Sequence, residues 1–124
     1  MIDDEFRAPT DDELDAAEKR LGLAFHPDYR SFQQGRRDLG DSILEPALIL
    51  PCQPHLDLFE IAESAWKQIG LPRDLLPIVE DNGDYYCVTS SGEVAFWSHD
   101  SGRTEESWPT IEAWRQATID EAGE

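Results

Sequence analysis

Cysteine and histidine are the residue types best suited to bind a metal ion, and the chain has two cysteines and three histidines. Cys52 and His55 are separated by two residues, which is half of a typical zinc motif. A structural zinc site needs four ligands, usually from two such pairs. Cys87 and His99 could supply the other ligands, but each lies alone in the sequence. We therefore predict no metal site. The glycine pattern also contains no phosphate-binding loop, so we predict no cofactor.

A serine or cysteine nucleophile would need a histidine base held close to it. Ser98, His99 and Asp100 are of the right types, but they are neighbours in the chain. Neighbours rarely form a catalytic triad, because the triad geometry joins residues from separate elements. Cys87 lies in a predicted strand, where a buried and inert thiol is the common outcome. We therefore predict that the protein is not an enzyme, with a small hydrolase using Cys87 or His99 as the alternative.

Residues 80–100 contain most of these candidates, and their sequence predicts two β-strands joined by a tight turn. Residues 85–89 and 94–97 are largely β-branched or aromatic, which is typical of strands. Residues 90–92 read Ser-Ser-Gly, a short hairpin loop with a glycine available for a positive φ.

A second hairpin signal, Asn82-Gly83, follows the apolar run at residues 76–79. The two signals together predict a three-stranded antiparallel meander. Asp81 and Asp84 flank the first turn. They could act as paired carboxylates, but aspartate and asparagine are also the ordinary residues of such turns.

Four helices are predicted around this sheet from capping residues and apolar spacing. They are expected after the capping box Thr10-Asp11-Asp12-Glu13, from Pro27 to Arg36-Arg37, over residues 58–69 and over residues 108–119. Residues 47–50 form a short apolar run between two prolines and predict a buried strand, while residues 98–107 predict a polar loop. We therefore predict one α+β domain over residues 1–124, with helices packed against a mainly antiparallel sheet of about four to six strands.

The formal net charge is -17, from 27 acidic and 10 basic residues. Residues 46–124 are the more one-sided part, with 15 acids and 4 bases. A field of this sign repels nucleic acids and anionic lipid surfaces, so neither is an expected partner. It attracts a basic protein surface, although an acidic surface can also serve solubility alone. No apolar run is long enough to span a membrane, and the acidic N-terminus does not resemble a secretory signal. Two cysteines form no disulfide framework, so we expect a cytoplasmic protein.

The order of several short motifs in the chain resembles the SUKH superfamily, also called the Smi/Knr family. The motifs are Leu76-Pro77, Gly83-Asp84-Tyr85-Tyr86-Cys87, Gly92, Val94, Trp97 and His99-Asp100. The early helix pair near Pro27-Asp28-Tyr29 and the closing helix after Trp108 are also similar to the family. The resemblance covers most of the chain and is loosest over residues 38–56.

This resemblance implies a protein-binding module rather than an enzyme. Many bacterial SUKH proteins are immunity proteins that bind and neutralise toxins of polymorphic or contact-dependent systems, and fungal relatives regulate cell-wall synthesis. The leading hypothesis is therefore an immunity protein, and its acidic charge would suit a basic, nuclease-like toxin domain. The alternative is a regulatory or scaffold domain without a toxin partner.

Candidate partner-binding residues lie in the predicted meander and in the polar loop after it. Acidic side chains there would steer a basic partner, and tryptophans are frequent interface hot spots. A tryptophan in a hairpin or at the start of a helix is more often part of the core. The candidates are Glu80, Asp81, Asp84, Trp97, His99, Glu105, Glu106 and Trp108.

Overall fold

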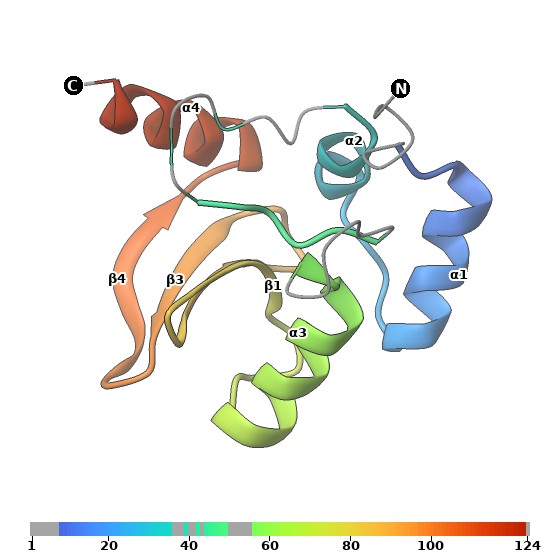
Figure 1. The fold of residues 1–124 in the computed structure, drawn as a ribbon, viewed down its shortest axis with the longest axis horizontal. Coiled ribbons are helices and arrows are strands. Elements are labelled where there is room, and N and C mark those ends of the chain that lie inside the picture. The colour runs from blue at the N-terminus through green and yellow to red at the C-terminus, as the bar shows by residue number, and fades with distance from the viewer. Residues whose placement is uncertain (1–7, 36–38, 40–41, 43, 50–55, 124) are drawn as a thin grey trace.

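The computed structural model describes residues 8–35, 39, 42, 44–49 and 56–123 (Figure 1). A four-stranded antiparallel sheet with the strand order β1-β2-β3-β4 lies at its centre. The strands are β1 (Leu76–Asp81), β2 (Asp84–Val88), β3 (Val94–Ser98) and β4 (Gly102–Trp108). The α+β class and the three-stranded meander predicted from the sequence are confirmed.

Strand β4 corrects the prediction of a polar loop over residues 98–107. Its register places Trp108 opposite Val94 and Gly102 opposite Ser98, with an irregularity in the pairing between Ala95 and Trp97. Most β4 side chains are exposed or half-buried, so the strand has no apolar alternation to predict it from sequence. Backbone pairing with β3 holds it in place, and Gly102 adopts a φ of +80° at the start of the strand.

The described helices are α1 (Asp11–Leu21), α2 (Pro27–Gly35), α3 (Leu58–Ser64) and α4 (Ile111–Ala122). The capping box of α1 is confirmed, because the Glu13 amide donates to the Thr10 hydroxyl and the Glu13 carboxylate accepts from the Thr10 amide. The helix predicted over residues 58–69 is confirmed, but its last turn is a π-helix, η3 (Ala65–Ile69). The predicted end of α2 at Arg36-Arg37 lies outside the described residues.

Helix α4 begins later than the sequence indicated. Trp108 ends β4, and Thr110 caps the helix by accepting a hydrogen bond from the Ala113 amide at 3.0 Å. Pro109 therefore precedes the cap instead of occupying the first turn. A tryptophan suits a strand as well as a helix, so pattern alone did not separate the end of β4 from the start of α4.

The strand predicted over residues 47–50 is wrong for the residues that the structure describes there. Pro46 and Leu48 form only isolated bridges, to Val79 and to Asp57 respectively. Because the two bridges have different partners, no continuous ladder can extend. The segment is nevertheless buried beside β1, where the Ala47 amide donates to the Ile78 carbonyl at 2.9 Å.

Trp114 joins the helical layer to the sheet and is fully buried. Its ring lies 6.1 Å from that of Phe32 on α2 and 5.6 Å from that of Tyr86 on β2, between ring centroids. Helices α2 and α4 consequently lie side by side at one end of the molecule (Figure 1). No described helix has the length and apolarity to cross a membrane.

The turn between β1 and β2 provides a direct test of the fold. Gly83 adopts a φ of +94°, and a Cβ there would lie 3.6 Å from the His99 ring. Because L-residues with side chains pay about 1–2 kcal/mol in left-handed conformations, we expect Gly83→Val to lower the melting temperature by about 4–8 °C. Thermal unfolding followed by circular dichroism measures this change.

Gly35→Ala is the matched control, because a Cβ at Gly35 meets no atom within 4 Å and its φ is not positive. Alanine is also the better helix former, so the control should keep or raise the melting temperature. Equal melting temperatures for Gly83→Val and the unaltered chain would contradict the turn geometry.

Candidate binding site

A hollow of about 430 Å³ opens between the sheet, α4 and residues 42 and 44. Three strands and one helix contribute to its walls. The side chains that give it chemical character are Asp81, Tyr86, Glu106, Trp108, Thr118 and Glu121. This volume falls in the lower part of the range for pockets that hold small ligands or single side chains.

Aromatic rings form one wall of the hollow. Tyr86 lies opposite Phe96 in the β2–β3 register, and their ring centroids are 4.8 Å apart. The Tyr86 ring also lies 5.9 Å from that of Trp108 and 5.6 Å from that of Trp114. Trp114 is fully buried, whereas Tyr86 and Trp108 are half-buried and line the opening. Core packing therefore fixes two aromatic rings at the surface.

Carboxylates surround these rings from three elements: Asp81 ends β1, Glu106 belongs to β4 and Glu121 to α4. Burial raises the pKa of Tyr86, and the negative charges of Glu106, Asp81 and Glu121 raise it further. All three carboxylates are therefore close enough to act electrostatically on Tyr86. Among the described residues, no lysine, arginine or histidine lines the hollow.

Neutralising partners for these carboxylates are absent from the described part of the chain. Within it, Glu106 and Glu121 form no ion pair, and Asp81 accepts only a 3.5 Å hydrogen bond from the Asn82 side-chain amide. The hollow thus combines aromatic surface with uncompensated negative charge. That arrangement suits a positively charged group.

A second group of predicted residues meets at the tips of the two hairpins. Asp84 accepts hydrogen bonds from the backbone amide of His99 at 3.0 Å and pairs with its Nδ1 at 2.7 Å. His99 Nε2 lies 3.3 Å from the Asp100 carboxylate. The hydrogen bond to Asp84 raises the pKa of His99, and the bonds from His99 lower that of Asp84. This pair ties the β1–β2 turn to the β3–β4 turn.

Residues 2–120 match the SUKH_5 family, described as SMI1-KNR4 cell-wall. The chain belongs to this family. It is also similar to the crystal structure of a protein from Pseudomonas syringae pv. tomato, with 34% sequence identity and a TM-score of 0.80. The match covers 89% of this chain and 81% of that one. No curated protein matches the chain. The resemblance inferred from the meander motifs is therefore confirmed.

The structure of this SUKH_5 protein sorts the eight predicted candidates into three groups. Asp81, Glu106 and Trp108 meet at the hollow, and Asp84 and His99 form the hairpin pair. The other three candidates lie elsewhere. Glu80 accepts a 2.8 Å hydrogen bond from the Gly83 amide, Trp97 lies beside Gly102, and Glu105 is exposed on β4.

The residues considered for catalysis do not form a nucleophile–base pair. The Ser98 hydroxyl accepts from the Asp100 amide at 3.2 Å, which makes it part of the β3–β4 turn. Cys87 is fully buried, and burial raises the pKa of its thiol to about 12. Cys52 and His55 lie outside the described residues. In the ranges that are described, no group of three or more His, Cys, Asp or Glu side chains could hold a metal ion.

Tyr86 and Glu121 line the hollow but were absent from the sequence prediction. Glu121 lies seven residues after Trp114, and Thr118 lies four after it, so the three share one helical face. That spacing was the sequence signal that could have placed Glu121 at the site. Recognising it required knowing that Trp114 packs on Tyr86, which only the tertiary structure provides.

The His99–Asp84 pair predicts a pH dependence of stability in this SUKH_5 protein. Because the pKa of folded His99 is raised, its contribution is fully present below its ordinary pKa of about 6.5 and disappears as pH rises through the folded value. We expect His99→Gln to lower the melting temperature more at about pH 6 than at about pH 9. Thermal unfolding at the two pH values measures the difference.

Asp84→Asn provides the control background, since it removes the carboxylate whose hydrogen bond is the largest cause of the raised pKa of His99, while the charge of Asp100 remains. In the Asp84→Asn background, the loss of melting temperature caused by His99→Gln should depend less on pH than it does in the unaltered protein. A loss of melting temperature that is the same at both pH values in the unaltered background would contradict the ion pair.

Proposed function

We propose that this protein is a protein-binding module, and that it acts as an immunity protein that neutralises a basic toxin of a bacterial polymorphic or contact-dependent system. The observation that carries the proposal is the hollow, in which Tyr86 and Trp108 are held at the surface among carboxylates without described counter-charges. Membership of the SUKH family supports it, because many bacterial members bind toxins. An immunity protein meets its toxin in the cytosol, so the proposal includes a cytoplasmic location.

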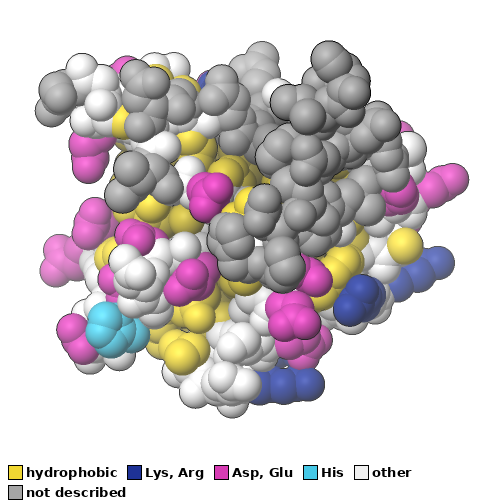
Figure 2. Space-filling model, viewed as in Figure 1, with side chains coloured by type: hydrophobic (Ala, Val, Ile, Leu, Met, Phe, Trp, Pro, Cys, Tyr) yellow, Lys and Arg dark blue, Asp and Glu magenta, His cyan; other side chains and the backbone are white. Residues whose placement is uncertain are grey.

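The distribution of charge supports a basic partner approaching from the hollow side. Residues 74–124 contain 12 acids and two bases, Arg103 and Arg115. Arg115 pairs with Glu112 at 3.0 Å on the same helix. Figure 2 shows acidic side chains on the side of the molecule where α4 and the β3–β4 hairpin lie and also on the opposite side, whereas most of the visible Lys and Arg side chains lie on the opposite side. Such a field raises the association rate of a basic partner.

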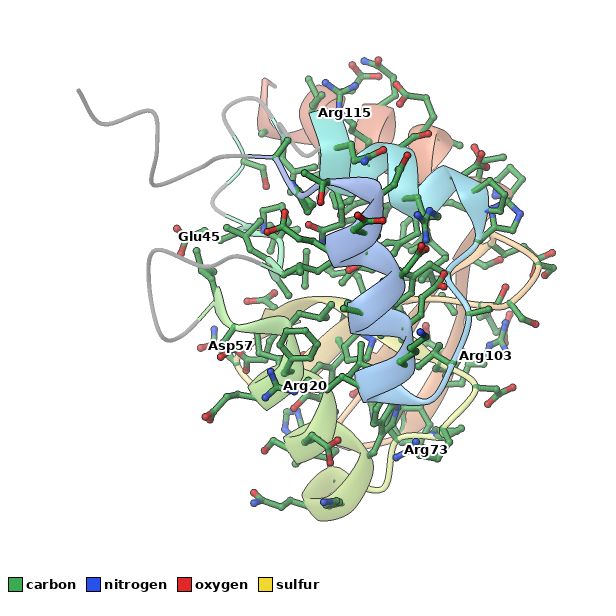
Figure 3. All side chains as sticks on the ribbon, turned by 90° about the vertical axis from the view of Figure 1, so that its right-hand side faces the viewer. Arg20, Glu45, Asp57, Arg73, Arg103 and Arg115 are labelled. Atoms are coloured by element: carbon green, nitrogen blue, oxygen red, sulfur yellow. The ribbon has the colours of Figure 1, made fainter. Side chains whose placement is uncertain are left out.

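Arginines on the α1 and α3 side are engaged by neighbouring aromatic rings. The Arg20 guanidinium lies 4.0 Å from the centre of the Phe59 ring, and that of Arg73 lies 4.3 Å from the centre of a Trp66 ring. Both are labelled in Figure 3, which faces α1. Neither arginine lines the hollow. Their absence from its walls leaves the described carboxylates of the hollow available to a basic partner.

We also propose that the protein has no catalytic activity of its own. The buried, protonated Cys87 and the turn-bound Ser98 favour this view over a hydrolase. The alternative within the binding class is a regulatory or scaffold domain without a toxin partner. Such a domain would need the same aromatic and acidic surface, so the identity of the partner distinguishes it from an immunity protein.

Charge reversal on β4 tests the proposal against a candidate toxin, which is to be sought among the products of the neighbouring genes. Glu105 and Glu106 are exposed, so Glu105→Lys/Glu106→Lys should leave the fold intact. We expect the association rate to fall at least about fivefold, and that of the unaltered protein to fall as salt rises. Stopped-flow or surface-based kinetics at low and physiological salt measure both rates.

Asp12→Lys/Asp74→Lys is the matched control, with the same change in net charge. Asp12 lies in the first turn of α1, and Asp74 follows Arg73, whose guanidinium donates to the Leu21 carbonyl at the end of that helix. The control should slow association much less than the β4 reversal. If the association rate changes neither with salt nor with either charge reversal, the acidic residues serve solubility and not recognition. If the toxin does not bind at all, the immunity proposal is wrong.

A further inference from the structure

We propose that the hollow receives an arginine side chain of the basic protein partner, with the guanidinium beside Tyr86 and Trp108 and within reach of Glu106, Glu121 and Asp81. This inference rests on the proposed function, which supplies the partner, and it specifies the group that the surface recognises. It is argued from the shape, the rings and the charge of the hollow.

The shape of the hollow favours a single side chain. Its volume of about 430 Å³ is too small for a helix or strand of a partner and large enough for one long side chain with ordered water. Its walls come from elements that are fixed by core packing, since the Tyr86 ring contacts Phe96 and Trp114. The entering side chain would therefore meet a preformed site, which limits the entropic cost of binding.

Charge requires that the occupant be a cation. The carboxylates of Glu106, Asp81 and Glu121 make the electrostatic potential at Tyr86 more negative, and none of the described residues that line the hollow is basic. Bringing three like charges together without counter-charges is unfavourable, so a cation that enters the hollow relieves their repulsion. Neither an anionic nor a purely apolar group would do so.

Arginine fits the hollow better than lysine or a metal ion. A guanidinium stacks on aromatic faces and presents several N–H donors in different directions, so it can meet two rings and carboxylates from different elements together. An ammonium group is a compact, strongly hydrated charge that loses more hydration on entering. The three carboxylates do not form a described group able to hold a metal ion.

A short peptide tests this inference without the toxin. We would titrate acetyl-Gly-Arg-Gly-amide into the ¹⁵N-labelled protein and follow the amides of Tyr86 and Thr118 and the indole N–H of Trp108 by NMR. We expect weak, saturable shifts at these positions in the millimolar range. The lysine peptide should bind more weakly, and the peptide with neutral citrulline should cause no saturable shift, because citrulline keeps the shape but not the charge.

Variants on neighbouring residues provide a matched comparison. Glu106 and Glu121 line the hollow, whereas the adjacent Glu105 and Asp120 do not. Glu106→Gln/Glu121→Gln should weaken arginine-peptide binding at least about fivefold, and Glu105→Gln/Asp120→Asn, with the same loss of charge, should weaken it less than about twofold. Circular dichroism confirms that both variants remain folded.

Each contrary outcome overturns a stated part of the inference. Absence of saturable arginine binding, or equal binding of the citrulline peptide, would overturn the cation site. Lysine binding as tight as arginine would overturn the assignment to arginine. Equal effects of the two double variants would place the binding outside the hollow.

The same variants with the toxin separate this inference from the proposed function. If the toxin binds but both double variants change its dissociation rate equally, the hollow is not its anchor although the immunity function stands. If the arginine peptide binds but the toxin does not, the immunity proposal fails and the cation site stands.

Discussion

The contact between the rings of Tyr86 and Trp114 determines how the rest of this surface is arranged. Trp114 is fully buried and contacts both Phe32 on α2 and Tyr86 on β2, so it anchors α4 against the sheet. Two turns further along the helix, Glu121 lies at the hollow that Asp81 and Glu106 also line. A packing interaction in the core thus creates an electrostatic feature at the surface.

The concentration of negative charge at the hollow is unfavourable for the stability of the fold, so its presence points to a role in function. Like charges held together without a counter-charge destabilise a folded protein, and acidic surfaces can be kept soluble by charges that are spread apart. In one other cluster the acidic residues do have a counter-charge: the Arg30 guanidinium lies 3.1 Å from Asp15 and 3.2 Å from Glu18. The contrast between this compensated cluster and the hollow favours recognition over solubility as the role of the hollow carboxylates.

Sequence patterns predicted the elements that have strong local signals. The glycines at the turns and the aromatic runs located β1 to β3, and the capping box located α1. Strand β4 was not predicted because its polar side chains show no alternation of apolar and polar residues. Its pairing depends on β3 lying beside it. Residues 47–50 were wrongly predicted to form a strand, because a buried apolar segment between prolines need not pair continuously.

The difference between local sequence signals and long-range contacts also explains which site residues were predicted. Asp81, Glu106 and Trp108 were identified because they lie in or just after the meander, within one stretch of sequence. Glu121 belongs to a different element, and Tyr86 was predicted as a strand residue but not as a partner-binding candidate. Their roles arise from the packing of α4, a long-range contact that no local pattern contains.

A crystal structure of the protein in complex with the basic toxin that the proposal requires tests the central claim most directly. The account predicts that the interface covers the hollow, with an arginine of the toxin seated beside Tyr86 and Trp108 and contacting at least one of the carboxylates. A complex in which the hollow stays open to solvent, with the toxin bound on the α1 and α3 side, would contradict it.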